Sequence, residues 1–435
     1  MKFSYQKSCL VDDHTIVELL ERLQPEIARM RAATHLKYET PYASINLPAD
    51  TKMFDEIDRM VQVKKGLRPA ALVVIGIGGS NLGTKAVHEA LRGTHHNMLD
   101  PLKVYYADTV DADYCMSLVA CIEDFLQAGQ VVILNIISKS GSTTETVANA
   151  QLFIDLIRCY HADYQQHIVV TTDYQSPLWE LAQKEGFATL SIPAHVGGRY
   201  SVFSAVGLFP LGLMGINIRA LVSGAQSVVS DYTEHSMQNY AAVRACILYA
   251  LYHARTISIH DFFIFAVHLQ SVGAWYRQLM GESIGKADDI HGNRVERGII
   301  PTVSIGSIDL HSVAQLYLGG PRIILTTFLT VAQQESSLTV IPSAPWKALA
   351  PAIQGKTLAE IMHAIVEGTQ AAYSNEARPF MEIELEQITE ESIGALLQMH
   401  MLEMMYLGYL LEVNPFDQPQ VELYKQETRK ILANE

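Results

Sequence analysis

The feature that most constrains the fold is a regular alternation of short β-branched runs with longer helical patterns, which begins near residue 71. Five such runs read "ALVVI" at 71, "VYYA" at 104, "VVILNII" at 131, "HIVVT" at 167 and "ATLSI" at 188. Apolar strands that alternate with helices are typical of a parallel sheet that is covered by helices. This pattern predicts an α/β domain, which we place at residues 55–220.

The rest of the chain predicts a second α/β domain and two smaller segments. Long helical patterns fill residues 240–280, and helical patterns return up to about residue 410. Between them stand three strand-like runs, "IIPTVSI" at 299, "RIILTTFL" at 322 and "LTVIP" at 338. A chain of 435 residues is too long for one ordinary core. We predict an N-terminal helical segment at 1–54, the second domain at 230–410 and a C-terminal arm helix at 411–435 that packs back onto the body.

Charge and cysteine content narrow the function classes. The formal net charge of -14 argues against a nucleic-acid partner and against an anionic membrane, because both require a basic face. The five cysteines are scattered and lack the CxxC spacing of a zinc or redox site. We therefore expect reduced thiols, as in a cytoplasm.

The start of the chain, "MKFSYQKSCLVDDH", lacks the apolar core and cleavage site of a signal peptide, which predicts a cytoplasmic protein. The most apolar stretch, "VFSAVGLFPLGLMGINI" at 202–218, contains Pro210 and Asn217 and is short for a membrane crossing. We expect it to form a buried helix and a turn.

A glycine-rich loop, "GIGGSNLGTK" at 76–85, follows the first strand of the alternation. A dinucleotide fingerprint would have its third glycine where Asn81 stands, although Asp108 resembles the ribose-binding acid of such sites. A Walker A loop would have its lysine where Thr84 stands. Two further interpretations remain, a loop that brings a sugar or phosphate oxygen to bare backbone with Ser80 as a donor, or a purely structural turn.

A second loop, "ISKSGSTTET" at 137–146, gathers six hydroxyls and Lys139 between a strand and a helical pattern. Such a cluster is either a simple strand-to-helix turn or an anion site at a helix N-terminus. In an open α/β sheet, loops after neighbouring strands meet at the carboxyl edge. Two loops of this kind at one edge favour a compact phosphomonoester over the pyrophosphate of a dinucleotide.

Six motifs in order resemble the glucose-6-phosphate isomerase (phosphoglucose isomerase) family, in its short bacterial form. They read "GIGGSNLG" at 76, "SKSGSTTET" at 138, "GGRYSVFSAVGL" at 197, "ESIGK" at 282, "DLHS" at 309 and "FDQPQVELYK" at 416. The resemblance implies two doubly wound sugar-isomerase (SIS) α/β domains and a C-terminal arm. It also implies the reversible conversion of glucose 6-phosphate to fructose 6-phosphate through a cis-enediol, in glycolysis and gluconeogenesis, without metal or cofactor.

Carried over residue by residue, the resemblance implies Glu282 as the base, Arg199 as the partner of the enediolate charge, His311 in ring opening and Lys425 at the ring oxygen. It places the substrate and its phosphate on Gly79, Ser80, Ser138, Lys139, Ser140, Thr143, Thr146, Gln278 and Gln418.

Spacing adds two expectations to this set. Gln278 and Glu282 are four residues apart, so they would share a helix face, and Gln418 and Lys425, seven apart, would do the same. The family's histidine acts in the neighbouring subunit, which implies a homodimer. Leu310 and Gln420 depart from the family's better-known pattern, which has Gln and Gly there.

Three other functions compete with this interpretation. A non-catalytic SIS regulator that binds a sugar phosphate would keep the 138–146 loop but would not need Glu282, Arg199, His311 and Lys425 together. A nicotinamide oxidoreductase conflicts with Asn81. An isomerase that also accepts mannose 6-phosphate would share every motif quoted above.

Overall fold

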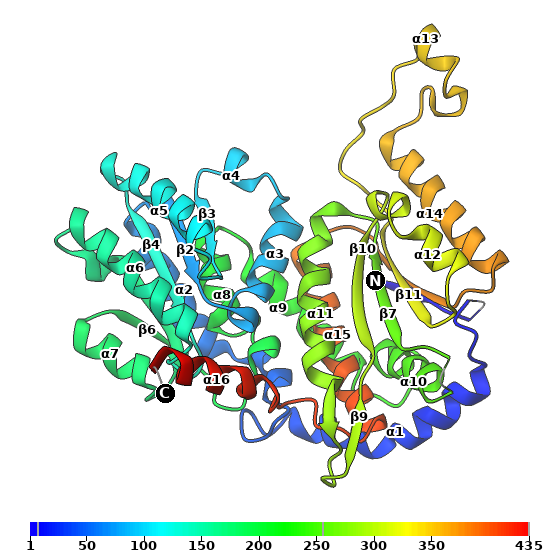
Figure 1. Ribbon diagram of the computed structural model, residues 1–435, viewed down its shortest axis with the longest axis horizontal. Coiled ribbons are helices and arrows are strands. Elements are labelled where there is room, and N and C mark those ends of the chain that lie inside the picture. The colour runs from blue at the N-terminus through cyan, green and yellow to red at the C-terminus, as the bar shows by residue number, and fades with distance from the viewer. Residues whose placement is uncertain (7, 255, 434–435) are drawn as a thin grey trace.

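The computed structural model describes residues 1–6, 8–254 and 256–433 and shows two β-sheets, each covered by helices, that lie side by side (Figure 1). Residues 7, 255, 434 and 435 belong to the predicted N-terminal segment, second domain and arm, and they lie outside the described residues. The predicted α/β fold class with parallel sheets is confirmed.

The first sheet contains the five strands that the alternation predicts, all parallel, in the order β3-β2-β4-β5-β6. They are β2 (Ala71–Ile75), β3 (Lys103–Ala107), β4 (Val132–Ile137), β5 (Ile168–Asp173) and β6 (Ala188–Ile192). Strand β2 is buried on both faces, because alternate side chains enter two different cores.

Helices on the two faces of the first sheet account for these two cores. One face packs against α5 (Ala112–Gln127), α6 (Thr144–Tyr160) and α7 (Pro177–Glu185). The other packs against α2 (Thr51–Gly66), α3 (Leu82–Arg92) and α8 (Ala205–Leu213), with the short α4 (His96–Leu99) beside β3. All nine residues of α8 are buried, so the apolar stretch at 202–218 is a buried helix followed by a turn, as predicted. No helix in the described ranges is long and apolar enough to cross a membrane.

The second sheet has the order β1-β12-β11-β7-β10, with only the edge strand β1 antiparallel. Its strands are β1 (Lys2–Ser4), β7 (Ile259–Ile264), β10 (Ile300–Ile305), β11 (Ile324–Val331) and β12 (Phe380–Leu385). Its helices are α1 (Asp13–Ala33), α10 (Tyr240–His253), α11 (Gln270–Ile284), α12 (Ala314–Gly319), α14 (Leu358–Asn375) and α15 (Glu390–Leu410). A two-stranded ribbon, β8 (Lys286–Asp288) with β9 (Arg294–Arg297), follows α11.

Two helix pairs join the halves of the molecule. Helix α3 packs against α11, and α9 (Ile218–Asp231) packs against α15. Because α9 runs across residues 220–230, it spans the gap between the two predicted domains. The division of the chain into domains stays a prediction, and β1 and α1 contribute to the second sheet and its helices.

Three expectations for the second half are wrong. Residues 259–264 and 380–385, expected within helical stretches, are strands β7 and β12. Strand β7 is hard to see in the sequence because it contains His260 and Asp261, which are buried and bonded to hydroxyls of neighbouring strands. The expected strand at 338–342 forms only an isolated bridge, and this segment leads to α13 (Ala344–Lys347) in an arm that projects from the body (Figure 1).

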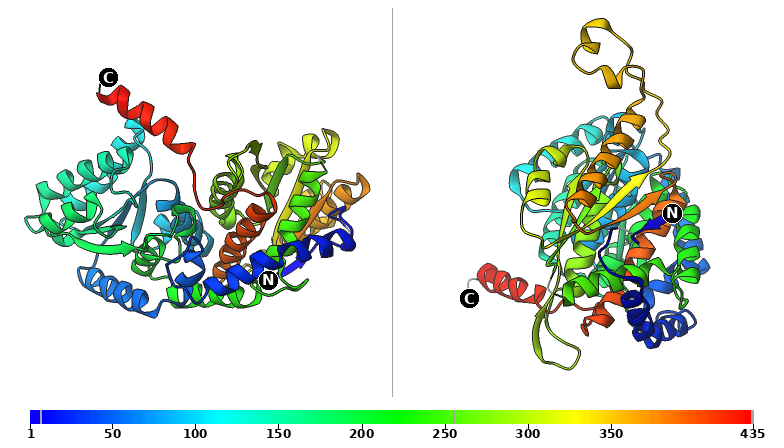
Figure 2. Two further views of the ribbon diagram at one scale, coloured as in Figure 1. Left: turned by 90° about the horizontal axis from the view of Figure 1, so that it is seen from below. Right: turned by 90° about the vertical axis from the view of Figure 1, so that its right-hand side faces the viewer.

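The C-terminal helix also departs from expectation. Helix α16 (Val421–Ala433) stands away from the two sheets in both further views (Figure 2), and none of its described residues is buried. The prediction that the arm helix packs back onto the body is therefore wrong for this single chain. The preceding turn does pack, because Phe416 contacts the rings of Tyr42 and Tyr200.

Candidate functional site

The candidate site begins at the carboxyl edge of the first sheet, where the loops after β2 and β4 leave their strands. The glycine loop contains a single 3₁₀ turn at Gly78–Ser80, and Gly79 lies directly against the backbone of Gly198. A methyl group on Gly79 would lie 2.1 Å from the Gly198 carbonyl carbon. The glycine therefore allows two loops to meet backbone to backbone. The approach of a ligand oxygen to this loop stays a prediction.

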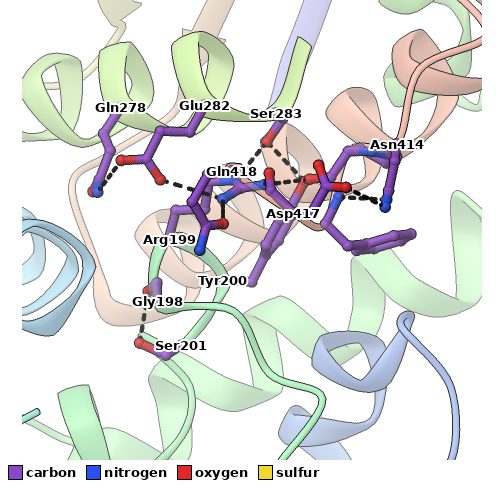
Figure 3. A network of polar contacts seen from close by, with 12 residues as sticks. Gly198, Arg199, Tyr200, Ser201, Gln278, Glu282, Ser283, Asn414, Asp417 and Gln418 are labelled. Carbon is purple, nitrogen blue, oxygen red and sulfur yellow. Dashed lines mark hydrogen bonds and ion pairs between the residues drawn. The ribbon is translucent and has the colours of Figure 1, made fainter. Parts of the chain in front are cut away.

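Arg199, in a 3₁₀ turn at Gly198–Tyr200, forms the centre of the site (Figure 3). Its side chain is 1% exposed, and all five of its N–H groups donate hydrogen bonds. The Nε group donates to Ser283 Oγ at 2.8 Å. One terminal nitrogen donates to Glu282 Oε2 at 3.2 Å and to Gln418 Oε1 at 2.8 Å. The other terminal nitrogen donates to the backbone carbonyls of Pro415 at 2.5 Å and Asp417 at 3.1 Å. A buried cation is thus held by groups from two distant segments, the end of α11 and the turn before α16.

Glu282 lies near the end of α11 and has both carboxylate oxygens engaged. Oε1 accepts a hydrogen bond from Gln278 Nε2 at 3.0 Å, and Oε2 accepts one from Arg199. The spacing prediction that Gln278 and Glu282 share a helix face is confirmed by this contact. Because the Glu282 side chain is 30% exposed while Arg199 is buried, the carboxylate is the accessible member of the ion pair.

The turn before α16 reaches the same cluster. Gln418 precedes the helix, which begins at Val421, so the expectation that Gln418 and Lys425 share a helix face is wrong. Gln418 instead accepts from Arg199, as Figure 3 shows. Asp417 pairs through Oδ1 with Lys286 Nζ at 3.0 Å.

Sequence reasoning missed Ser283, Lys286, Tyr200 and Asp417 as members of the cluster. Lys286 also donates to the Glu282 carbonyl at 2.8 Å, and burial lowers the pKa of its ammonium group against the opposing effect of Asp417. The Ser283 hydroxyl lies 3.0 Å from that of Tyr200. All four residues stand inside the quoted motifs, within four positions of Glu282, Arg199 or Gln418, and that proximity was the available signal.

The hydroxyl loop after β4 forms a compact turn ahead of α6. Ser138 is buried, with its Oγ 3.1 Å from Thr143 Oγ1 and accepting from the Gly141 N–H at 3.2 Å. Gly141 has φ +70°, a left-handed conformation that glycine adopts without strain. Thr143 occupies the N-cap of α6 without a capping bond from its side chain, and Thr146 is buried in the first turn. Ser140 is exposed at the outside of the turn.

Lys139 does not extend freely from this loop. Its Nζ donates to the carbonyls of Ala194 at 2.6 Å and Val196 at 2.9 Å, just beyond β6. Burial lowers the pKa of this ammonium group, while Asp173 opposes the shift. The lysine therefore fastens the hydroxyl loop after β4 to the segment that follows β6, two strands away in the sheet.

His311 and Lys425 stand apart from the Arg199 cluster. His311 ends the 3₁₀ turn Ile308–His311 after β10 and is exposed. Lys425 lies on α16 and forms an ion pair with Glu422 at 2.7 Å. Among the described residues, neither forms a hydrogen bond or ion pair with Glu282, Arg199 or the hydroxyl loop.

The arrangement suits proton transfer next to a developing negative charge. A partly exposed carboxylate is a suitable general base, and a fixed guanidinium beside it stabilises an oxyanion without rearranging during the reaction. The hydroxyls and free N–H groups at the start of α6 are suitable donors for a phosphate.

Comparison with known proteins agrees with the family resemblance of the sequence motifs. A family model described as "Phosphoglucose isomerase" matches residues 61–435. The chain is 32% identical over 423 residues to a glucose-6-phosphate isomerase of Thermus thermophilus, covering 96% of this chain and 97% of the relative. It is 33% identical over 395 residues to that of a Staphylococcus aureus strain, covering 89% and 86%.

Two solved structures share the fold over nearly the whole chain. A hypothetical protein from Thermus thermophilus has a TM-score of 0.86 at 30% identity and covers 99% of each chain. A glucose-6-phosphate isomerase from Chlamydia trachomatis has a TM-score of 0.84 at 20% identity, covering 99% of this chain and 88% of that one.

Proposed function

The chain belongs to the phosphoglucose isomerase family, and we propose that Glu282 moves the proton in its reaction, the interconversion of glucose 6-phosphate and fructose 6-phosphate. The protein is an aldose–ketose isomerase. A non-catalytic sugar-phosphate regulator is not favoured, because the relatives that match most of the chain are named as isomerases.

The observation that carries the assignment of Glu282 is the fixed position of its carboxylate. Gln278 and Arg199 each hold one oxygen, and the group keeps 30% exposure. In the open-chain aldose, Glu282 takes the proton from C2, the C–H electron pair forms the C1–C2 double bond, and the aldehyde oxygen becomes negative. A proton moves between the two oxygens and Glu282 returns its proton to C1, which gives the ketose.

Arg199 supports this sequence as a fixed positive charge. All five of its N–H groups are engaged with the protein, so its charge is already in place when the enediolate forms.

The phosphate is proposed to bind at the start of α6. Support comes from Thr143 at the N-cap, the exposed Ser140 and the nearby hydroxyls of Ser138 and Thr146. A dianion there meets the positive end of the helix and unpaired backbone N–H groups. Gly79 and Ser80 are proposed to line the sugar from the β2 loop, together with Gln278 and Gln418.

We further propose a homodimer in the cytoplasm, in which His311 opens the sugar ring in the partner's site and Lys425 assists at the ring oxygen. The exposure of His311 supports this, as do four apolar side chains on α16 that are 55–73% exposed in the single chain, namely Leu423, Tyr424, Ile431 and Leu432. All five cysteines are free, which agrees with a reducing compartment.

The proposal for Glu282 is tested with Glu282→Gln in heavy water. The amide keeps the shape of the carboxylate but accepts no proton, so turnover and deuterium uptake at C1 or C2 should be lost while 6-phosphogluconate still binds. Glu296→Gln, on the exposed ribbon strand β9, is the matched control and should exchange like the wild type. If Glu282→Gln exchanges deuterium near the wild-type rate, another group is the base.

A further inference from the structure

A second cluster of chemically active side chains lies in the connection from α6 to β5. His161 follows the end of α6, Asp163 is in the next turn, and His167 ends the 3₁₀ turn Tyr164–His167. One possible ligand atom from each of the three side chains lies within 4.8 Å of the other two. The order H-x-D-x₃-H places three residues of metal-binding types within seven consecutive positions.

The two imidazoles face each other with unsatisfied nitrogens. His161 Nε2 and His167 Nδ1 are both buried and have no hydrogen-bond partner. His167 as a whole residue is only 3% exposed. The ring centroids are 4.5 Å apart with an interplanar angle of 54°. A buried polar atom without a partner is costly, so unpartnered nitrogens on two adjacent rings favour a ligand that binds both imidazoles.

The charges around the cluster are compatible with a cation. The cluster itself brings one carboxylate, that of Asp163, to the two imidazoles. The positive charge of Lys64 would oppose a bound cation, and its Nζ donates to the Gln166 carbonyl at 2.6 Å. The exposed carboxylate of Asp163 offsets that positive charge on the solvent side.

We propose that His161, Asp163 and His167 form a binding site for a divalent transition-metal ion of the zinc class. Two imidazole nitrogens and one carboxylate oxygen are a known three-ligand set for zinc, with water in the fourth position. A tetrahedral ion needs ligand atoms about 3.3 Å apart, which small side-chain rotations reach from the present separation.

The position of the site indicates a structural purpose. The cluster precedes β5 and so lies at the amino edge of a parallel sheet, whereas the hydroxyl loop follows β4 at the carboxyl edge. An ion here would tie the end of α6 to the start of β5 without contacting the substrate. The proposal is thus independent of the isomerase mechanism.

The test is metal binding by the full chain after treatment with a chelator that is then removed. Calorimetry with Zn²⁺ and the visible spectrum with Co²⁺ should both report one site, with the absorption of a four-coordinate ion. Zn²⁺ at 100 times its dissociation constant should shift the folding equilibrium about 100-fold toward the native state, which raises the melting temperature.

Variants make the assignment specific. Asp163→Asn changes an exposed side chain and should keep the fold, and His161→Gln provides a second, independent change. Each should weaken Zn²⁺ binding at least tenfold. His363→Ala is the matched control, because His363 pairs with Glu367 on an exposed helix surface, and the affinity of this variant should equal that of the wild type. Equal affinity in all four proteins, or no stoichiometric binding in the wild type, would overturn the proposal.

Discussion

Gly79→Ala should inactivate the site by forcing apart two loops that touch each other, although the substitution changes no polar group. The added methyl would lie 2.1 Å from the carbonyl carbon of Gly198, 2.4 Å from its oxygen and 2.5 Å from the backbone nitrogen of Arg199. Contacts shorter than 3.0 Å are essentially never seen for a real Cβ, so the two loops must separate by about 0.9 Å. Because Gly79 does not have positive φ, alanine adds no backbone strain.

The size of the effect follows from the position of Arg199. Its backbone is one of the displaced groups, and its terminal nitrogen now lies 3.2 Å from Glu282 Oε2. A displacement of about 1 Å between catalytic groups costs roughly 100-fold in rate, which corresponds to about 2.7 kcal/mol in the transition state. We expect kcat/KM for fructose 6-phosphate to fall by that factor in an assay coupled to glucose 6-phosphate formation.

Gly198→Ala is the matched control, because it adds a methyl on the other side of the same contact. Its nearest neighbour would be Gly79 Cα at 3.6 Å, an ordinary van der Waals distance. Circular dichroism should show both variants folded, with only Gly79→Ala impaired. If the two variants differ by less than twofold in kcat/KM, the backbone contact does not position Arg199 and the reasoning is refuted.

Three further predictions concern the other parts of the site. Ser140→Ala combined with Thr143→Ala should raise KM at least tenfold with the fold intact, because each charge-assisted bond to a phosphate contributes about 1.5–3 kcal/mol; an unchanged KM would place the phosphate elsewhere. Mixing inactive His311→Ala and Glu282→Gln chains should restore part of the activity, since one site of the mixed dimer would hold both native residues; verified heterodimers without activity would contradict a shared site. Burial raises the pKa of Asp173 to about 6, so the native state binds the extra proton and the free energy of unfolding should decrease as pH rises from about 4 to about 6. Asp173→Asn should flatten that decrease in denaturant titrations, and an unaltered slope would show that Asp173 is not its cause.

The local sequence was sufficient for the first half of the fold and for the motifs of the site. Each strand of the first sheet is a continuous apolar run between helical patterns, so its identity is visible within a few residues. The four-residue spacing of Gln278 and Glu282 likewise fixed their contact, because both stand on one uninterrupted helix. Such features depend on neighbours along the chain and need no knowledge of distant segments.

Partners that are distant in sequence decided the rest. Strand β7 contains the polar residues His260 and Asp261. They are tolerated because hydroxyl groups of adjacent strands form hydrogen bonds with them, those of Thr327, Thr302 and Ser304. The sequence near β7 does not indicate that these hydroxyl groups will be close. Conversely, the run at 338–342 has the composition of a strand but no neighbouring strand to pair with among the described residues, so Leu338 and Ile341 remain exposed.

The same reason separates the site residues that the sequence could place from those that it could not. Arg199 was recognised from its motif, but its burial depends on acceptors 83 to 219 positions away, including Ser283 and Gln418. The imidazoles of His161 and His167 are six residues apart on neither a regular helix nor a regular strand, so only the turn between α6 and β5 brings their nitrogens together. Spacing is informative where the backbone is regular, and the tertiary structure alone determines which side chains meet where it is not.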